Sequence, residues 1–333
     1  MIFGFKDSLR QAVEAASGGL ATVMYTPKGQ PLFMRRITPF RLEDLAPDGS
    51  LGTGWHPAFP DGREFWVSIY RIRVHDGEPI SVPGVGLSVP TLSGLLGLPM
   101  PPGMRFLSLL EYSALALMGT KLLGDVLRGN DDRGRNQTYP WETGVRADGL
   151  PPGTPSGNPA VLTGSGPTTW RRDHTPWGVE LVGNYRVFLA GLRFKNGAIQ
   201  FRLDGAALNP LDSDDAEWSA WDTEGNVVSG NASGILGYMP GGLVGTTRVN
   251  STLVFSYADI APDTGITIPP LMRALGLAPS LYTRGDVGLY HTADTPVLLP
   301  GFGGSWHFPP AAPGTVRGFA ATVSFSALLV YRD

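Results

Sequence analysis

Side chains that commonly perform chemistry are few in this sequence and lie far apart. The 333 residues include no cysteine, which excludes disulfides, thiolate metal ligands and cysteine nucleophiles. No two of the five histidines have the four-residue spacing that places two imidazoles on one helix face. They are His56, His75, His174, His291 and His307. We expect structural or surface histidines, with no bound metal and no cofactor.

Other catalytic patterns are also missing. The chain has no Gly-x-Ser-x-Gly segment for a serine nucleophile and no Gly-x-Gly-x-x-Gly at a strand-to-helix junction. Residues 212–217 (DSDDAE) are rich in carboxylates, but they lack the glycine and the distal glutamate of a calcium loop. A solvated loop is expected there, with a calcium ion as the alternative. Residues 131–135 (DDRGR) are expected to form a salt-bridged turn.

Composition predicts an ordered globular protein. Apolar residues make up 42% of the chain and the net charge is −3, so no clustered basic surface for nucleic acid is expected. Glycine (45) and proline (30) are frequent and alternate with aromatic residues, which indicates rigid loops of the kind found in thermophiles. No apolar run is long enough to insert into a membrane, and the first residues lack a secretion-signal pattern. Display on a virion or on a cell surface by another export route is compatible with this pattern.

Local patterns predict an α+β protein with two main helices and many short strands. Residues 6–17 have helical apolar spacing and precede a hairpin of strands 20–25 and 32–37, which suggests a small module over residues 1–50. The rest, 51–333, is expected to form one larger domain with a long irregular stretch. Its expected elements are a strand at 65–74, a helix at 104–123, loops at 129–176, strands at 179–188, 191–194, 198–203, 253–257 and 324–331, a turn at Asn196-Gly197 and a helix at 271–277.

Several segments, in order, resemble the C-type-lectin-like fold of formylglycine-generating, sulfatase-modifying proteins. Trp177-Gly-Val-Glu-Leu-Val-Gly-Asn184 resembles that family's G-V-x-D-L-x-G-N signature. Gly303-Gly-Ser-Trp306 with Leu329-Val-Tyr-Arg332 resembles its closing R-G-G-S-W and I-G-F-R strands, although Gly301-Phe302 replaces the arginine and Val330 the glycine. Further similar segments are Trp55-His-Pro-Ala-Phe59, Phe65-Trp-Val-Ser-Ile-Tyr70, Met104-Arg-Phe-Leu-Ser-Leu-Leu-Glu-Tyr112 and Tyr139-Pro-Trp141.

The resemblance favours a branch of this fold that catalyses nothing. Formylglycine-generating oxidases use a cysteine pair for copper and substrate thiol, and this chain has no cysteine. Glu14-Ala-Ala-Ser-Gly-Gly19, Lys28-Gly-Gln-Pro31 and Asp222-Thr-Glu-Gly-Asn226 are similar to segments of variable proteins of diversity-generating retroelements. In that family a reverse transcriptase rewrites a C-terminal cassette, and the lectin-like scaffold presents the result to a protein or cell-surface ligand.

The C-terminal segment, about 303–333, is therefore the expected ligand-binding surface. All residues from His307 to Asp333 belong to the set that adenine-directed mutagenesis of Asn-type codons can encode. The family pattern marks as variable His307, Phe308, Phe319, Thr322, Ser324, Phe325, Ser326 and Leu328. It marks as scaffold Trp177, Gly183, Asn184, Gly303, Gly304 and Trp306. The competing hypotheses are a phage tail or decoration protein of the same fold without diversification and, less favoured, an oxidase.

Overall fold

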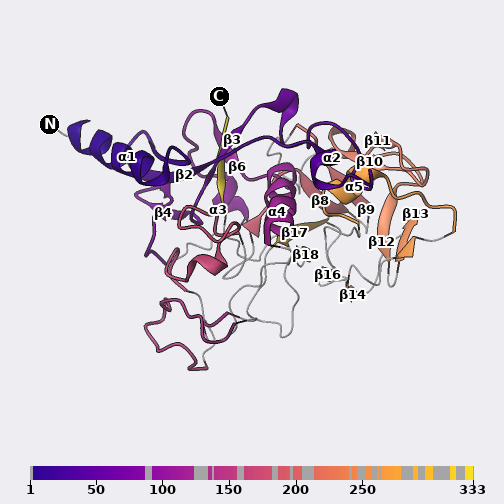
Figure 1. Ribbon diagram of the computed structural model, residues 1–333. Helices are drawn as coiled ribbons and strands as arrows, with labels where there is room; N and C mark the ends of the chain where they lie inside the picture. Colours follow the sequence, from indigo (N-terminus) through magenta and orange to yellow (C-terminus); the bar gives the residue numbers. More distant parts are fainter. Residues whose placement is uncertain are drawn as a thin grey trace.

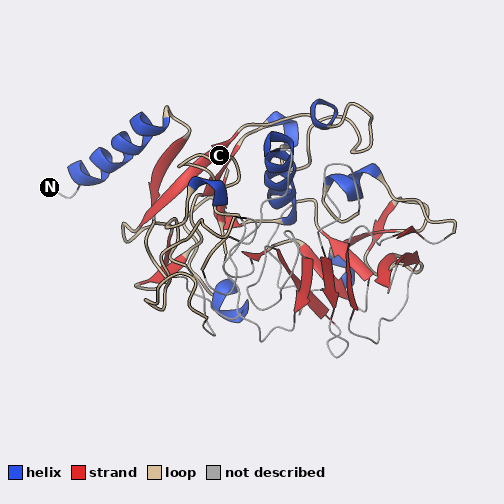
Figure 2. Ribbon diagram, turned by 60° about the horizontal axis from the view of Figure 1, so that its bottom comes forward, coloured by secondary structure: helices blue, strands red, loops and turns tan. Residues whose placement is uncertain are grey.

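The computed structural model of the chain describes residues 3–86, 92–123, 134–136, 139–155, 161–181, 187–195, 198–204, 214–239, 242–245, 253–256, 261–262, 264–278, 288–291, 297–302, 316–319 and 327–332. Over these ranges few helices accompany several sheets whose strands pair mainly antiparallel, so the fold is α+β (Figure 1). In Figure 2, helix α4 (Leu109–Leu123) stands between the two larger sheets, and α1 (Phe3–Ser17) extends from one end of the molecule.

The smaller of these sheets joins the N-terminal hairpin to the last described strand. Its order is β1-β2-β3-β19-β6, and all four pairings are antiparallel. The strands are β1 (Ala21–Tyr25), β2 (Pro31–Ile37), β3 (Phe65–Ser68), β19 (Leu329–Tyr331) and β6 (Met104–Phe106). Because β2 pairs with β3 over four residue pairs, this sheet crosses the boundary at residue 50 that the sequence suggested. The hairpin is thus part of the same smaller sheet as β3, β19 and β6.

The larger sheet contains most of the remaining strands. Its main order is β14-β16-β18-β17-β8-β9-β12-β13-β15, with β10, β11 and β7 attached at its side. Their bounds are β7 (Val187–Phe188), β8 (Leu192–Lys195), β9 (Ala198–Phe201), β10 (Ser219–Trp221), β11 (Val227–Ser229), β12 (Leu236–Met239), β13 (Gly242–Gly245), β14 (Leu253–Ser256), β15 (Ala261–Pro262), β16 (Gly288–His291), β17 (Val297–Phe302) and β18 (Val316–Phe319).

Short elements complete the described chain. A separate hairpin is formed by β4 (Arg73–His75) and β5 (Glu78–Ile80). The short helices are α2 (Leu42–Leu45), α3 (Leu92–Leu96) and α5 (Pro270–Ala274), with single 3-10 turns at η1 (Pro60–Gly62), η2 (Thr168–Trp170) and η3 (Asp215–Glu217). Among the described residues no helix is both long enough and apolar enough to cross a bilayer.

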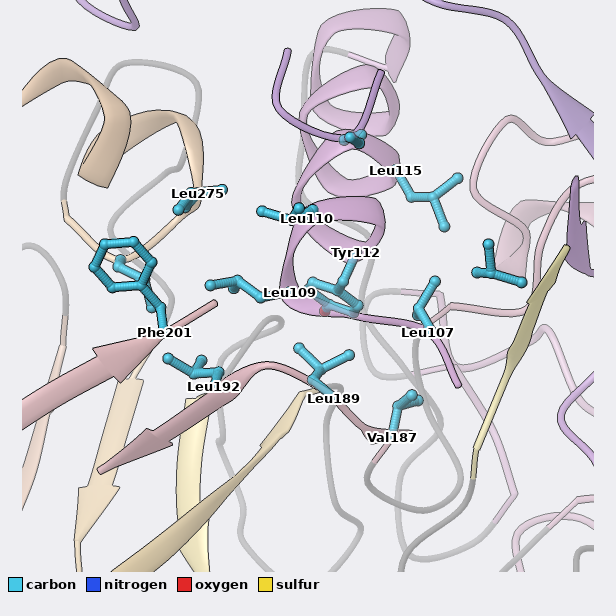
Figure 3. Close-up of a cluster of buried hydrophobic side chains, with 14 of the residues drawn as sticks. Leu107, Leu109, Leu110, Tyr112, Leu115, Val187, Leu189, Leu192, Phe201 and Leu275 are labelled. Atoms are coloured by element: carbon cyan, nitrogen blue, oxygen red, sulfur yellow. The ribbon is translucent and has the colours of Figure 1, made fainter. Parts of the chain in front are cut away.

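The main core lies between α4 and the strands that follow it in the chain. Leu109 lies at the start of α4 above Leu189 and Leu192, whereas Leu110 and Leu115 leave the helix on opposite sides, as Figure 3 shows. Phe201 stacks on Trp221 with ring centroids 3.9 Å apart, which closes the core beside β9. The near-continuous apolar surface of α4 predicted central burial, and this prediction is confirmed.

Two predicted elements differ from the structure, each for a local reason. The helix expected from residue 104 begins at Leu109, because Ser108 caps it: the Ser108 hydroxyl accepts from Leu110 N at 3.2 Å, and Ser108 N donates to the Glu111 carboxylate at 3.1 Å. The strand expected over 65–74 breaks after Ser68. Beyond it Arg71 is fully buried, and its guanidinium donates to the carbonyl of Leu181 at 3.2 Å.

Of the strand expected at 179–188, residues 179–181 form no strand and only residues 187–188 form β7, while residues 182–186 lie outside the described chain. The first helix, both strands of the first hairpin and the pairing of β8 with β9 are confirmed, and the turn expected at Asn196-Gly197 lies outside the described residues. The helix expected at 271–277 is α5, and the strand expected at 253–257 is β14. Only residues 329–331 of the strand expected at 324–331 form a strand in the described chain, while residues 324–326 lie outside it.

Candidate functional site

The C-terminal segment follows a strand of the larger sheet, β17, and ends in a strand of the smaller sheet, β19. At its start, β17 pairs with β7, which places Phe302 opposite Val187. At its end, β19 pairs with β3 on one side and β6 on the other, so it is an inner strand of the smaller sheet. Between residues 303 and 326 the structure describes only β18, which pairs with β17 and β16. Both ends of the segment are therefore held by backbone pairing.

A chain of backbone hydrogen bonds links these two ends. Leu107 N donates to the carbonyl of Leu328 at 2.9 Å, and Ala190 N donates to the carbonyl of Leu107 at 2.9 Å. Ala190 lies three residues after Val187, the partner of Phe302. Residues 107 and 190 thus form a bridge between the two sheets, and the segment starts and finishes on this bridge.

Glu111 on α4 fixes the last described residue to the same frame. Its fully buried carboxylate pairs with Arg105 of β6 and, at 2.7 Å, with Arg332. The Arg332 guanidinium also donates to the carbonyl of Ala58 at 2.5 Å and lies 5.1 Å from the centre of the Phe65 ring. Burial by itself raises the pKa of Glu111, but Arg105, Arg332 and the Ser108 hydroxyl outweigh it and lower this pKa to about 2.

The predicted ligand-binding surface is wrong at Leu328. It was expected to be a variable, ligand-facing position, whereas its side chain is 0% exposed and packs in the main core with Val67 and Leu107. The physical reason is its position directly before β19, which is an inner strand paired with β3 on one edge and β6 on the other, next to the main core. Phe319 lies at the end of β18 opposite Leu299. The other expected surface residues lie outside the described residues: His307, Phe308, Thr322, Ser324, Phe325 and Ser326.

The expected scaffold residues fall mostly outside the described chain as well. Gly183, Asn184, Gly303, Gly304 and Trp306 belong to this group. Trp177 is described: it is partly buried and packs against the apolar cluster of Val13, Val23 and Tyr70 beside α1. Glycine at 178, the next residue of the same motif, leaves no room for a side chain, because a Cβ there would lie 2.3 Å from the Asp173 carboxylate.

A histidine and a serine come together in the core, but their geometry does not support nucleophilic chemistry. The His56 Nε2 lies 3.4 Å from the Ser113 hydroxyl, which donates to the carbonyl of Leu110. His56 Nδ1 accepts from Ala58 N, so the ring proton belongs on Nε2, which faces the carbonyl of Ala274 at 3.3 Å. Burial lowers the pKa of His56 to about 4. A buried pair whose protons are both directed at backbone carbonyls neither reaches a substrate nor activates the serine.

The acidic stretch at 212–217 is structured in its described part. Asp214 caps the turn η3, with Ala216 N donating to its carboxylate at 3.1 Å and Glu217 completing a capping box. Asp215 pairs with Arg193 at 2.5 Å and Lys195 at 2.7 Å. These carboxylates are occupied by the protein itself, and in the described part of the chain no three His, Asp or Glu side chains gather as a metal site.

Two of the exposed aromatic residues of the described chain lie on the loop after α4. Trp141 is 76% exposed and Tyr139 is 42% exposed, with ring centroids 5.4 Å apart. The loop is stiffened by the fully buried Arg146 side chain, which pairs with Asp148. A pocket of about 240 Å³ opens beside Val145, and residues 143–146 are part of its lining. Paired Tyr and Trp side chains on a rigid loop have the chemistry of a recognition surface.

Comparison with known proteins adds no family to this description. No protein-family model matches the chain, and no curated protein has a sequence similar to it. The function therefore has to be inferred from the residues of the chain and from their geometry.

Sequence reasoning missed the elements that hold the segment. The pairing of Glu111 with Arg332 joins residues far apart in the chain, which no local pattern reveals. One local signal was available: Ser108-Leu-Leu-Glu111 has the Ser-x-x-Glu form of a capping box and marks the helix start. The inward side chain of Leu328 had no such signal, because apolar residues fit a buried strand and an adhesive surface equally well.

Proposed function

We propose that this protein is a non-enzymatic ligand-binding protein with a C-type-lectin-like scaffold, which presents residues 303–326 as a diversified recognition surface. The observation that carries the proposal is the clamp at both ends of that segment. Phe302 pairs with Val187, and Leu328 is bonded to the bridge formed by Leu107 and Ala190. A loop whose ends are fixed close together on a rigid frame tolerates changes between them, as recognition loops do on other scaffolds.

The ligand is a protein or another cell-surface molecule. The net charge of −3 and the absence of a basic cluster in the sequence disfavour nucleic acid. The resemblance to retroelement variable proteins supplies the diversification hypothesis, and the enclosed His56–Ser113 pair favours binding over catalysis. Trp141 and Tyr139 offer a second contact surface, outside the C-terminal segment, for the same ligand or for a carrier particle.

A display library tests the proposal. Codons for His307, Phe308, Phe319, Thr322, Ser324, Phe325 and Ser326 are randomised, and folded clones are selected by protease resistance. A matched library randomises the same number of positions at buried residues, among them Ala327, Leu328 and Val330, which are 0% exposed. We expect most clones of the first library and few of the second to fold.

Selection of the libraries against a panel of unrelated purified proteins then measures how often each library yields binders. Binders are expected from the C-terminal library and not from a third library placed on β4 and the turn that follows it, where residues 73 and 75–77 are exposed. Equal protease sensitivity in the first two libraries, or binders at equal frequency in the first and third, would refute the proposal. A native locus without a reverse transcriptase and without a near-copy of this coding segment would leave the undiversified structural protein as the better hypothesis.

A further inference from the structure

Two buried arginines share a single carboxylate between β2, α4 and the loop that follows η2. Asp173 Oδ2 accepts from Arg35 Nη2 at 3.1 Å and from Arg172 Nη2 at 3.4 Å. The other oxygen, Oδ1, is taken by the backbone N of Thr175 at 3.2 Å and by its hydroxyl at 2.7 Å. The side chains of Arg35, Arg172 and Asp173 are only 11%, 4% and 8% exposed.

The rest of both guanidinium groups has no partner in the described part of the chain. Nε and Nη1 of Arg35 and Nε and Nη1 of Arg172 are shielded from solvent and make no hydrogen bond. The neighbouring Arg171 shows how the same loop satisfies an arginine, since its guanidinium donates to the carbonyls of Pro176, Gly178 and Gly164. Arg36 Nε and the indole nitrogens of Trp170 and Trp221 are also buried without a hydrogen bond in the described chain, but Arg35 and Arg172 each have two such atoms and share one carboxylate.

The charge of the cluster is also unbalanced. Two guanidiniums, which stay protonated in proteins, face one carboxylate, which leaves one positive charge in a nearly closed site. Burial lowers the pKa of Arg172, and the neighbouring Arg35 lowers it further while Asp173 raises it. Water can satisfy N–H groups but leaves the excess charge, whereas an anion does both.

We propose that the Arg35–Arg172 cluster binds a small oxyanion, such as inorganic phosphate, sulfate or a carboxylate group. Nε and Nη1 of both guanidiniums make no hydrogen bond, while their Nη2 atoms meet at the same Asp173 oxygen, so one ligand with several acceptor oxygens can serve both arginines. The ligand is held beside the loop at Thr175–Gly178, whose surface residue His174 has a left-handed backbone (φ 55). This site is distinct from the C-terminal segment and independent of its proposed function.

Thermal unfolding of the full chain at constant ionic strength tests the site, with phosphate, sulfate, acetate and chloride as probes. A ligand that binds the native state raises the melting temperature in a saturable way, and we expect a rise of about 3 °C or more with phosphate or sulfate. Acetate distinguishes a carboxylate source from an inorganic one. Stabilisation by chloride equal to that by all three oxyanions would overturn the assignment to an oxyanion.

Two substitutions in the cluster should change the response to phosphate in opposite directions. Arg172→Met leaves a neutral Arg35–Asp173 pair, so the protein should fold without added anion and lose the response. Asp173→Asn removes the one counter-charge, so it should lower the melting temperature and increase the response to phosphate. Arg10→Met, at an arginine that is 47% exposed, changes the net charge equally and should keep the wild-type response.

The proposal would be overturned if the wild-type protein responded to phosphate no more strongly than Arg172→Met. If Asp173→Asn does not fold, Arg35→Met provides the second test, because it should lose the response in the same way as Arg172→Met. Isothermal titration of phosphate into the wild-type protein and Arg172→Met gives the same comparison without heating.

Discussion

Replacement of Glu111 by glutamine removes a charge and almost no volume from the point where β6, α4 and Arg332 meet. The wild-type carboxylate is 0% exposed and pairs with Arg105 and Arg332, whose side chains are 25% and 22% exposed. Glutamine keeps an acceptor oxygen but leaves two partly buried guanidiniums without a counter-charge. Breaking such a pair on one side costs about 3–5 kcal/mol when both partners are buried, and the partial exposure of the arginines places the expected loss near the lower value.

The lowered pKa of Glu111 expresses the same pairing as a dependence of stability on pH. It is lowered from 4.5 to about 2 in the folded protein. Each pKa unit corresponds to about 1.4 kcal/mol, so ionised Glu111 contributes about 3 kcal/mol to the free energy of unfolding. Because the folded pKa is lower than the unfolded one, this contribution is complete above pH 4.5 and is lost as the pH falls from 4.5 toward 2.

Urea unfolding from pH 7 to pH 2.5 measures both effects. We expect Glu111→Gln to be less stable than the wild type by about 3 kcal/mol at pH 7, with the difference shrinking below pH 4.5. Glu64→Gln is the matched control, since Glu64 is 45% exposed and lies 3.8 Å from Arg36, and it should change stability by less than about 0.5 kcal/mol. Equal stability of Glu111→Gln and wild type at pH 7, or parallel pH profiles, would show that the pairing has been misjudged.

Three further predictions concern the same frame. Burial lowers the pKa of His56 from 6.5 to about 4, so the wild type should lose about 3 kcal/mol as the pH falls from 6.5 to 4, and His56→Gln should lack this loss in urea titrations. Leu328→Ala should cost about 2–5 kcal/mol in chemical unfolding, whereas Trp141→Ala should stay within about 0.5 kcal/mol, because their exposed fractions are 0% and 76%. Gly103→Ala should cost about 1–3 kcal/mol in thermal unfolding, since Gly103 has a φ of +74° and its Cβ would lie 2.7 Å from the Tyr331 ring.

The elements that sequence predicted well are those decided by near neighbours. The first helix ends at Gly18-Gly19, where both glycines adopt positive φ, and the hairpin that follows has a Pro-Lys-Gly turn. Helix α4 was found because its apolar residues recur over four turns. Local chemistry and the final fold agree in these segments.

The features that sequence could not supply depend on partners far along the chain. Whether Leu328 faces ligand or core is decided by β3 and β6, and nothing in residues 324–331 identifies these partners. The burial of Arg71 depends on carbonyls at residues 180 and 181. Nothing in the sequence around Arg35 marks it as unusual. Its lack of hydrogen-bond partners for Nε and Nη1 is seen only in the folded chain, where residues 171–178 pack beside it.

The inner position of β19 has a consequence for synthesis of the chain. Strands β3 and β6 each pair with residues 329–331, which the ribosome translates after residues 303–326. Until then both strands lack this partner. A frameshift or premature stop within that stretch removes β19 and Arg332 together, leaving two open strand edges and a buried Glu111 that has lost one of its two arginine partners. Such a product is a substrate for proteases, so the fold itself restricts what accumulates in the cell to sequences read in frame to the end of β19.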